Sequence, residues 1–235
     1  MKKLVLTTVF TAALTGMVFA QGNISWSGPT AAAFTAQTNG ATYSAFFGGG
    51  STGSGTTAAA TGTAALGYYF ELVDTSVYQA AKPTSFSALA TWTDTGLYAT
   101  NSVSNAGRFA VFNPNVATTV SWSPGTTNSI MMVGWSANLG STYAAAIANL
   151  QNSTYLNNLS AAAFFGVSNV GFITTLSTAT SPGAAVFGTA GTAQGTPINS
   201  LNTQLYLVPV STPEPGTMAL AALGGASLLL FRRRK

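Results

Sequence analysis

Few side chains in this sequence could do acid-base chemistry. The chain holds four acidic and eight basic residues, with no histidine and no cysteine. Without histidine, a Ser-His-Asp triad, a Cys-His pair and a histidine-ligated metal site are all excluded. The remaining acid-base candidates are Glu71, Asp74 and Asp94, which could in principle supply the carboxylate pair of a glycoside hydrolase.

The context of these acids favours another interpretation. Glu71 and Asp74 fall at the end of an expected strand, where solvation of a surface charge explains them. Calcium coordination needs several clustered oxygen ligands at a spacing that the chain lacks. We therefore predict no catalytic residue, no metal and no cofactor, and a protein that is not an enzyme.

The four tryptophans are the other side chains that could bind a ligand. Their amphipathic rings are of the kind that stack on sugars, so an exposed set would indicate a carbohydrate-binding module with Trp26, Trp122 and Trp135 as stacking residues. Packing in the core is the favoured interpretation. Trp92 shares a strand face with Phe86, and Trp122 shares one with valines.

The charges are concentrated at the two ends of the chain. Six of the eight basic residues lie within residues 1–20 and 211–235. Between residues 21 and 212, Lys82 and Arg108 stand against the three acids named above, a net charge of −1. Because nucleic-acid binding needs several cations on phosphates, no nucleic-acid partner is expected. With so few titrating groups, we also expect a stability that is nearly flat between about pH 5 and 9.

Residues 21–210 predict one exported all-β domain. Alternating apolar and polar residues, with Gly, Pro and Asn at the breaks, indicate a single β-sandwich, jelly-roll-like or related. A β-solenoid is the second choice, since no repeat of fixed period occurs. The clearest alternation covers 85–93, and a Ser-Pro-Gly turn is expected to join 116–122 and 130–135 as a hairpin. The expected strands are 23–27, 42–47, 67–73, 85–93, 108–112, 116–122, 130–135, parts of 163–176, and 203–208.

Helices and loops are expected at a few places. Ser141 is a suitable N-cap for one short helix that ends at Leu150. The glycine-, serine- and threonine-rich run 48–63 predicts a surface loop, as does 177–197.

The N-terminus has the pattern of a secretory signal peptide. Lys2 and Lys3 precede a short apolar stretch, and Val18-Phe19-Ala20 provides the residues before a cut. We predict cleavage by signal peptidase between Ala20 and Gln21, which makes residues 1–20 the signal peptide.

The C-terminus combines three features in order. Pro213, Glu214 and Pro215 precede an uncharged run, 217–231, and the chain closes on Arg232, Arg233, Arg234 and Lys235. The 15 residues of the run would span about 22 Å as a helix, which is short for a bilayer core of about 30 Å. The basic cluster keeps its end in the cytoplasm, so the preceding domain lies outside the inner membrane.

This tail, residues 211–235, resembles the PEP-CTERM sorting signal of Gram-negative surface proteins. The resemblance implies that Pro213, Glu214 and Pro215 are recognised by an exosortase-type membrane protease, and that the basic cluster holds the transmembrane helix in place. It implies a precursor held transiently in the inner membrane and then released to the cell surface or the extracellular matrix. An ordinary permanent anchor remains the alternative.

Two functions fit these observations. The first is a non-catalytic surface or extracellular-matrix protein, delivered by the secretory pathway. The alternative is a carbohydrate-binding module whose exposed tryptophans bind exopolysaccharide.

Overall fold

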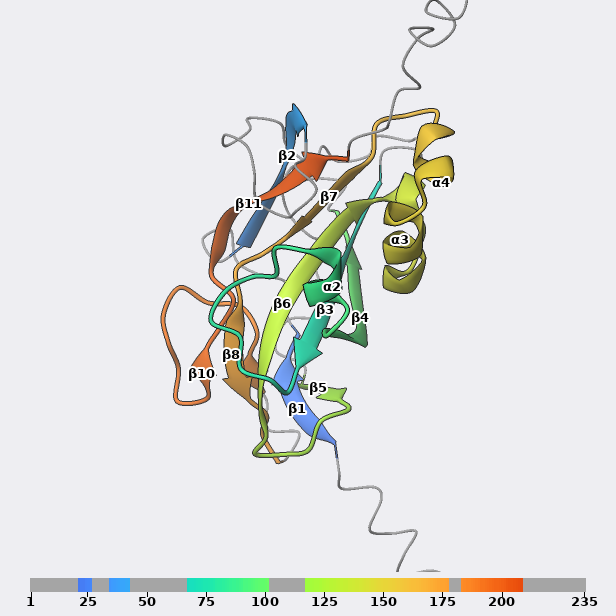
Figure 1. Cartoon of the computed structure of the whole chain (residues 1–235). Helices are drawn as coiled ribbons and strands as arrows, with labels where there is room; N and C mark the ends of the chain where they lie inside the picture. Colours follow the sequence, from blue (N-terminus) through green and yellow to red (C-terminus); the bar gives the residue numbers. More distant parts are fainter. Residues whose placement is uncertain (1–20, 27–33, 43–66, 102–116, 178–182, 209–235) are drawn as a thin grey trace, which may run out of the picture.

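The computed structural model describes residues 21–26, 34–42, 67–101, 117–177 and 183–208 (Figure 1). This part of the chain is mostly β-sheet, as predicted, with a few short helices. The strands are β1 (Gly22–Ser25), β2 (Phe34–Thr42), β3 (Tyr68–Thr75), β4 (Thr93–Thr100), β5 (Ala117–Val120), β6 (Thr127–Ser136), β7 (Phe164–Val167), β8 (Gly171–Thr174), β9 (Ala184–Ala185), β10 (Gly195–Thr196) and β11 (Ser200–Leu207). The helices are α2 (Phe86–Leu89), η2 (Ala137–Leu139), α3 (Tyr143–Leu150) and α4 (Ser153–Asn157).

The strands form two sheets. The larger has eight strands in the order β10-β8-β6-β7-β11-β2, with β3 paired to β6 and β4 paired to β3. The smaller has the order β5-β1-β9. Most neighbours are antiparallel, and the exceptions are β11 with β2 and β1 with β9. β6 is the hub of the larger sheet, because it pairs with β3, β7 and β8.

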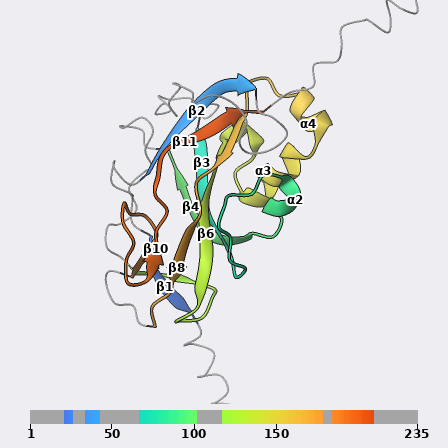
Figure 2. The same ribbon diagram turned by 60° about the vertical axis from the view of Figure 1, so that its left-hand side comes forward.

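Both faces of the larger sheet are covered, so β6 reads as an almost continuous apolar run. On one face, Phe70, Leu72 and Met132 share a core with Ile24 and Val120 of the smaller sheet. Alternate residues point the other way. There, the side chains of Val73, Met131, Val133 and Trp135 pack with those of the helices, which gather on one side of the larger sheet (Figure 2).

The strand predicted at 85–93 is wrong. Residues Phe86–Leu89 form α2, and β4 begins only at Thr93. The hydroxyl of Ser85 accepts a hydrogen bond from the backbone N–H of Ala88 at 3.1 Å, which makes Ser85 an N-cap. Phe86 and Leu89 also stand at helical spacing and contribute to the same core. The alternation was therefore ambiguous, and capping with tertiary packing selects the helix.

Replacing Ser85 with alanine is expected to destabilise the protein by about 1 kcal/mol, the usual effect of losing an N-cap. Chemical denaturation of the full chain measures this change. Ser76→Ala is the matched control, since Ser76 is exposed and lies outside α2 and its N-cap. An unchanged midpoint for Ser85→Ala would contradict the capping role.

The hairpin predicted from 116–122 and 130–135 is also wrong. β5 pairs with β1 in the smaller sheet, whereas β6 belongs to the larger one. Gly125, at φ +74°, makes the turn, but the chain uses it to cross from one sheet to the other. The turn residues therefore predicted correctly that the chain reverses between β5 and β6. They did not show that the two strands pair with other strands.

Other predictions fare better. The helix expected at 141–150 is α3, with Thr142 rather than Ser141 as its N-cap, and it is one of three α-helices in the described ranges instead of a single one. Strands 23–27, 67–73 and 203–208 correspond to β1, β3 and β11. β2, at Phe34–Thr42, was not predicted, and of the strand expected at 42–47 only Thr42 is described. Residues 43–47, 48–63 and 108–112 lie outside the described part.

No helix among the described residues is long and apolar enough to cross a membrane. The predicted transmembrane segment, 217–231, lies outside them, as does the predicted signal peptide.

Candidate functional site

The tryptophan side chains lie in the interior. Trp26 and Trp92 are each 5% exposed, Trp122 is 8% exposed, and Trp135 is fully buried. The indole N–H of Trp135 donates to the carbonyl of Gly140 at 2.8 Å. A sugar needs an open ring face, and none of the four rings offers one. Their burial agrees with core packing, the favoured interpretation, and gives no support to Trp26, Trp122 and Trp135 as stacking residues. Burying these large apolar rings stabilises both cores.

The acids interpreted as solvated charges are in fact buried. Glu71 is 4% exposed and Asp74 is 6% exposed, and both lie in β3 at the centre of the larger sheet. Both acids were expected at the end of a strand, in contact with solvent. The sequence did contain an indication that Glu71 is buried. It is the acid within a stretch that is otherwise apolar on both faces, as in a strand covered on both sides.

A β-bulge brings Asp94 to Glu71. The pairing of β3 with β4 shifts between Leu72 and Val73, so that Val73 lies opposite Asp94. Gly96 follows close behind with a positive φ of +71°, which glycine adopts readily. Its N–H donates to Asp94 Oδ1 at 2.6 Å. Glu71 and Val73 share a strand face. The two carboxyl groups therefore meet on the side of the sheet that α3 covers.

Burial, together with a hydrogen bond and charge repulsion from Asp94, raises the pKa of Glu71 to about 8. The backbone N–H of Tyr143, at the start of α3, donates to Glu71 and opposes this shift. The phenol pKa of Tyr143 is raised by burial and by both carboxylates. At neutral pH, Glu71 is thus protonated and donates to Asp94. This cluster links β3, β4 and α3. Within it Glu71 and Tyr143 are buried, whereas Asp94 is exposed.

A second buried acid lies at the end of β3. Asp74 Oδ2 accepts from the side-chain amide of Asn128 at 2.5 Å, while Asp74 Oδ1 and Asn128 Oδ1 have no hydrogen-bond partner. Burial raises the pKa of Asp74 and the amide lowers it, with a net rise. Because the protonated form costs less to bury, Asp74 also favours a bound proton in the folded state.

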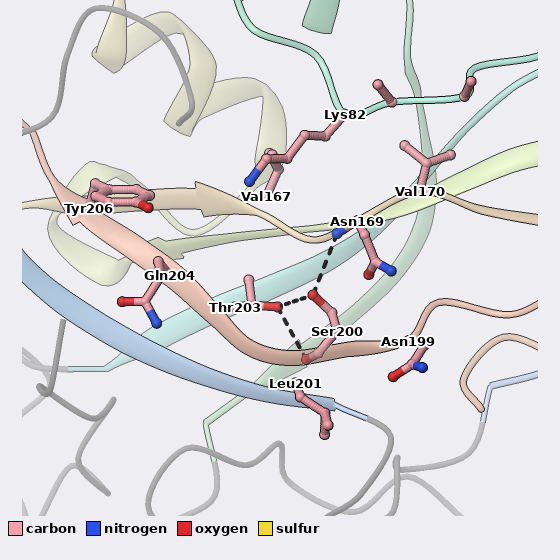
Figure 3. A pocket seen from close by; sticks show the side chains of 12 residues that line it. Lys82, Val167, Asn169, Val170, Asn199, Ser200, Leu201, Thr203, Gln204 and Tyr206 are labelled. Carbon is pink, nitrogen blue, oxygen red and sulfur yellow. Dashed lines mark hydrogen bonds between the residues drawn. The ribbon is translucent and has the colours of Figure 1, made fainter. Parts of the chain in front are cut away.

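A polar groove opens on the larger sheet (Figure 3). We call it the Lys82 groove. It has a volume of about 530 Å³ and is lined by residues 80–82, by Val167 with the β7–β8 loop, and by Asn199 and β11 as far as Tyr206. Lys82 reaches in from its loop, and Asn169 and Gln204 come from the opposite walls (Figure 3). Sequence analysis missed this groove, because its walls come from three segments far apart in the chain.

Hydrogen bonds fix the floor of the Lys82 groove. The hydroxyls of Ser200 and Thr203 are 2.6 Å apart, and the N–H of Asn169 donates to Ser200 Oγ at 3.5 Å. Ser200, Thr203 and Tyr206 are buried, whereas Lys82 and Asn169 are exposed. The groove thus combines a rigid base with polar side chains that a ligand can reach.

The predicted processing sites lie almost wholly outside the described residues. These are Ala20, Pro213, Glu214, Pro215 and the basic cluster 232–235. Gln21, the expected first residue after signal cleavage, is described and exposed.

Comparison with known proteins places one segment. Residues 211–235 match the model of the PEP-CTERM protein-sorting motif, which confirms the resemblance of the tail. No curated protein and no solved structure matches the chain. The matched motif implies export and a membrane-anchored precursor stage.

Proposed function

We propose that this chain, which ends in a PEP-CTERM protein-sorting motif, is a non-catalytic exported protein of the cell surface or extracellular matrix. The match of residues 211–235 carries the proposal. In this proposal, signal peptidase cuts after Ala20, and an exosortase-type protease processes the chain near Pro213-Glu214-Pro215. The inner membrane holds the precursor only transiently.

The character of the described domain supports a structural role. Glu71 and Asp74 are buried within the sheet and hydrogen-bonded to protein groups, so they are poor candidates for acid-base catalysis. The net charge of −1 between residues 21 and 212 weakens the repulsion between copies, which suits a protein that accumulates in a matrix. The burial of the tryptophans removes the support for sugar stacking on them.

Processing at both ends is the expected outcome of this proposal. Intact-mass measurement of the protein recovered from the cell surface should give a chain that begins at Gln21 and ends near Pro213. A double change, Pro213→Ala with Pro215→Ala, should leave the tail attached and the protein in the membrane fraction.

Pro124→Ala is the matched control, because Pro124 lies in the turn before β6 and outside the motif. This variant should be processed like the unaltered chain. Surface protein that still carries Arg232 to Lys235 would contradict cleavage and favour a permanent anchor.

A further inference from the structure

We propose that the Lys82 groove binds a carboxylated sugar of an acidic polysaccharide, with Lys82 pairing with the carboxylate and Tyr78 stacking on a neighbouring sugar ring. This goes beyond the proposed function, because it assigns a ligand and a site to the exported domain. It does not depend on how the tail is processed.

The lining of the groove suits a polyhydroxylated ligand. Its volume of about 530 Å³ lies within the range of about 300–1,000 Å³ of small-molecule sites. Such sites are usually mostly apolar. Here, Asn169 and Asn199 place side-chain amides around the space, and Gln204 also lines it while its Nε2 donates to Gln37 Oε1 at 3.3 Å. Each amide both donates and accepts, as sugar hydroxyls do. The ligand is therefore expected to be rich in hydroxyl groups.

The positive charge of Lys82 indicates that the ligand of the groove carries an anionic group. Lys82 is the one basic residue among those that the structure describes, it is exposed, and it forms no ion pair with a described acid. Neither Glu71, Asp74 nor Asp94 lines the groove. A single ammonium group suits a singly charged carboxylate. A phosphate is usually held by several cations or by backbone N–H groups.

An exposed aromatic side chain lies two residues before the groove lining in the sequence. Tyr78 is 66% exposed, and its ring meets that of Phe172 edge-on, with centroids 5.1 Å apart and planes at 87°. This contact supports the ring while leaving much of it in solvent. Tyr78 is two residues before Ala80, which lines the groove, so their Cα atoms lie within about 7 Å. Tyr78 therefore presents an exposed ring close in the chain to residues that line the groove, whereas the tryptophans are buried.

Isothermal titration of the full chain, purified in mild detergent, with trigalacturonic acid tests the proposal. Binding is expected, and it should weaken as salt increases. Maltotriose, a neutral sugar of the same length, should bind at least about tenfold more weakly, since it lacks the charge-assisted hydrogen bond to Lys82. Lys82→Gln should weaken trigalacturonic acid binding by a similar factor and leave maltotriose binding unchanged.

The aromatic contact has a matched pair of variants. Tyr78→Ala should weaken binding of both sugars by about tenfold, in the range of losing one aromatic stacking contact. Tyr98→Ala should have no effect, because Tyr98 is similarly exposed, at 63%, but lies on β4, which contributes no residue to the groove lining. Circular dichroism confirms that each variant is folded.

Several outcomes would overturn the proposal. One is equal affinity for the acidic and the neutral sugar, and another is unchanged binding by Lys82→Gln. Displacement of trigalacturonic acid by inorganic phosphate at equal concentration would show a general anion site rather than a sugar site. Failure of trigalacturonic acid to bind would reject the carboxylated-sugar assignment and leave the processing of the tail unaffected.

Discussion

Replacing Trp135 with alanine is expected to destabilise the protein by about 4 kcal/mol, as deletion of a buried aromatic side chain usually does. Trp135 is fully buried in β6 and packs with Tyr69 and Tyr143, at centroid distances of 6.0 Å and 6.4 Å. The change removes these contacts and also the hydrogen bond to Gly140. Urea denaturation of the full chain should show a much lower midpoint.

Two variants separate packing from other effects. Trp135→Phe keeps most of the apolar volume and loses the hydrogen bond, so it should cost less than Trp135→Ala. Tyr98→Ala removes an exposed ring from the same sheet and should change the stability by less than about 0.5 kcal/mol, as is usual at the surface. A midpoint for Trp135→Ala close to that of the unaltered chain would contradict the role of Trp135 in the core.

The sequence was informative where one periodicity dominated. The run 67–73, apolar on both faces except at Glu71, predicted β3, and the helical spacing of Tyr143 and Leu150 predicted α3. The structure buries nearly all of β3 and both of these helical side chains. Local patterns were enough here, because the same faces that look apolar in the sequence meet in the core. The tail was also readable, since its three features are contiguous.

Long-range pairing was beyond local patterns. The segment 85–93 alternates like a strand, but Ser85 can also cap a helix, and only packing beneath α2 decides between the two. β5 and β6 are joined by a tight turn and still belong to different sheets. The Lys82 groove forms where residues 80–82, residues 167–170 and β11 come together. No spacing in the sequence indicates that these three segments are neighbours.

Burial of the acids was the most consequential difference. Glu71 was interpreted as a solvated charge at a strand end, whereas β3 has β4 on one side and β6 on the other, and α3 lies above it. The expectation of a flat pH profile assumed that every acid titrates as it does in water. The raised pKa values of Glu71 and Asp74 overturn that expectation.

We expect the stability of the folded protein to fall as the pH rises from about 5 to 8. The pKa of Glu71 is about 8 in the folded state against a model value of 4.5. Between these values the folded protein holds a proton that the unfolded chain releases, so stability decreases with pH. The contribution of Glu71 to the stability should be highest below pH 4.5 and should level off above pH 8. The raised pKa of Asp74 acts in the same direction.

The loss should be up to about 5 kcal/mol, for a pKa shift from 4.5 to about 8 at about 1.4 kcal/mol per unit, and urea midpoints measured at each pH would record it. Glu71→Gln isolates the cause, because a neutral amide can donate to Asp94 and accept from the N–H of Tyr143 as protonated Glu71 does. This variant should lose most of the pH dependence and be the more stable protein at pH 8. Asp74→Asn should remove only the part due to Asp74. If the stability of Glu71→Gln falls with pH as steeply as that of the unaltered chain, another group binds the proton. The link between β3, β4 and α3 would then not depend on a protonated Glu71.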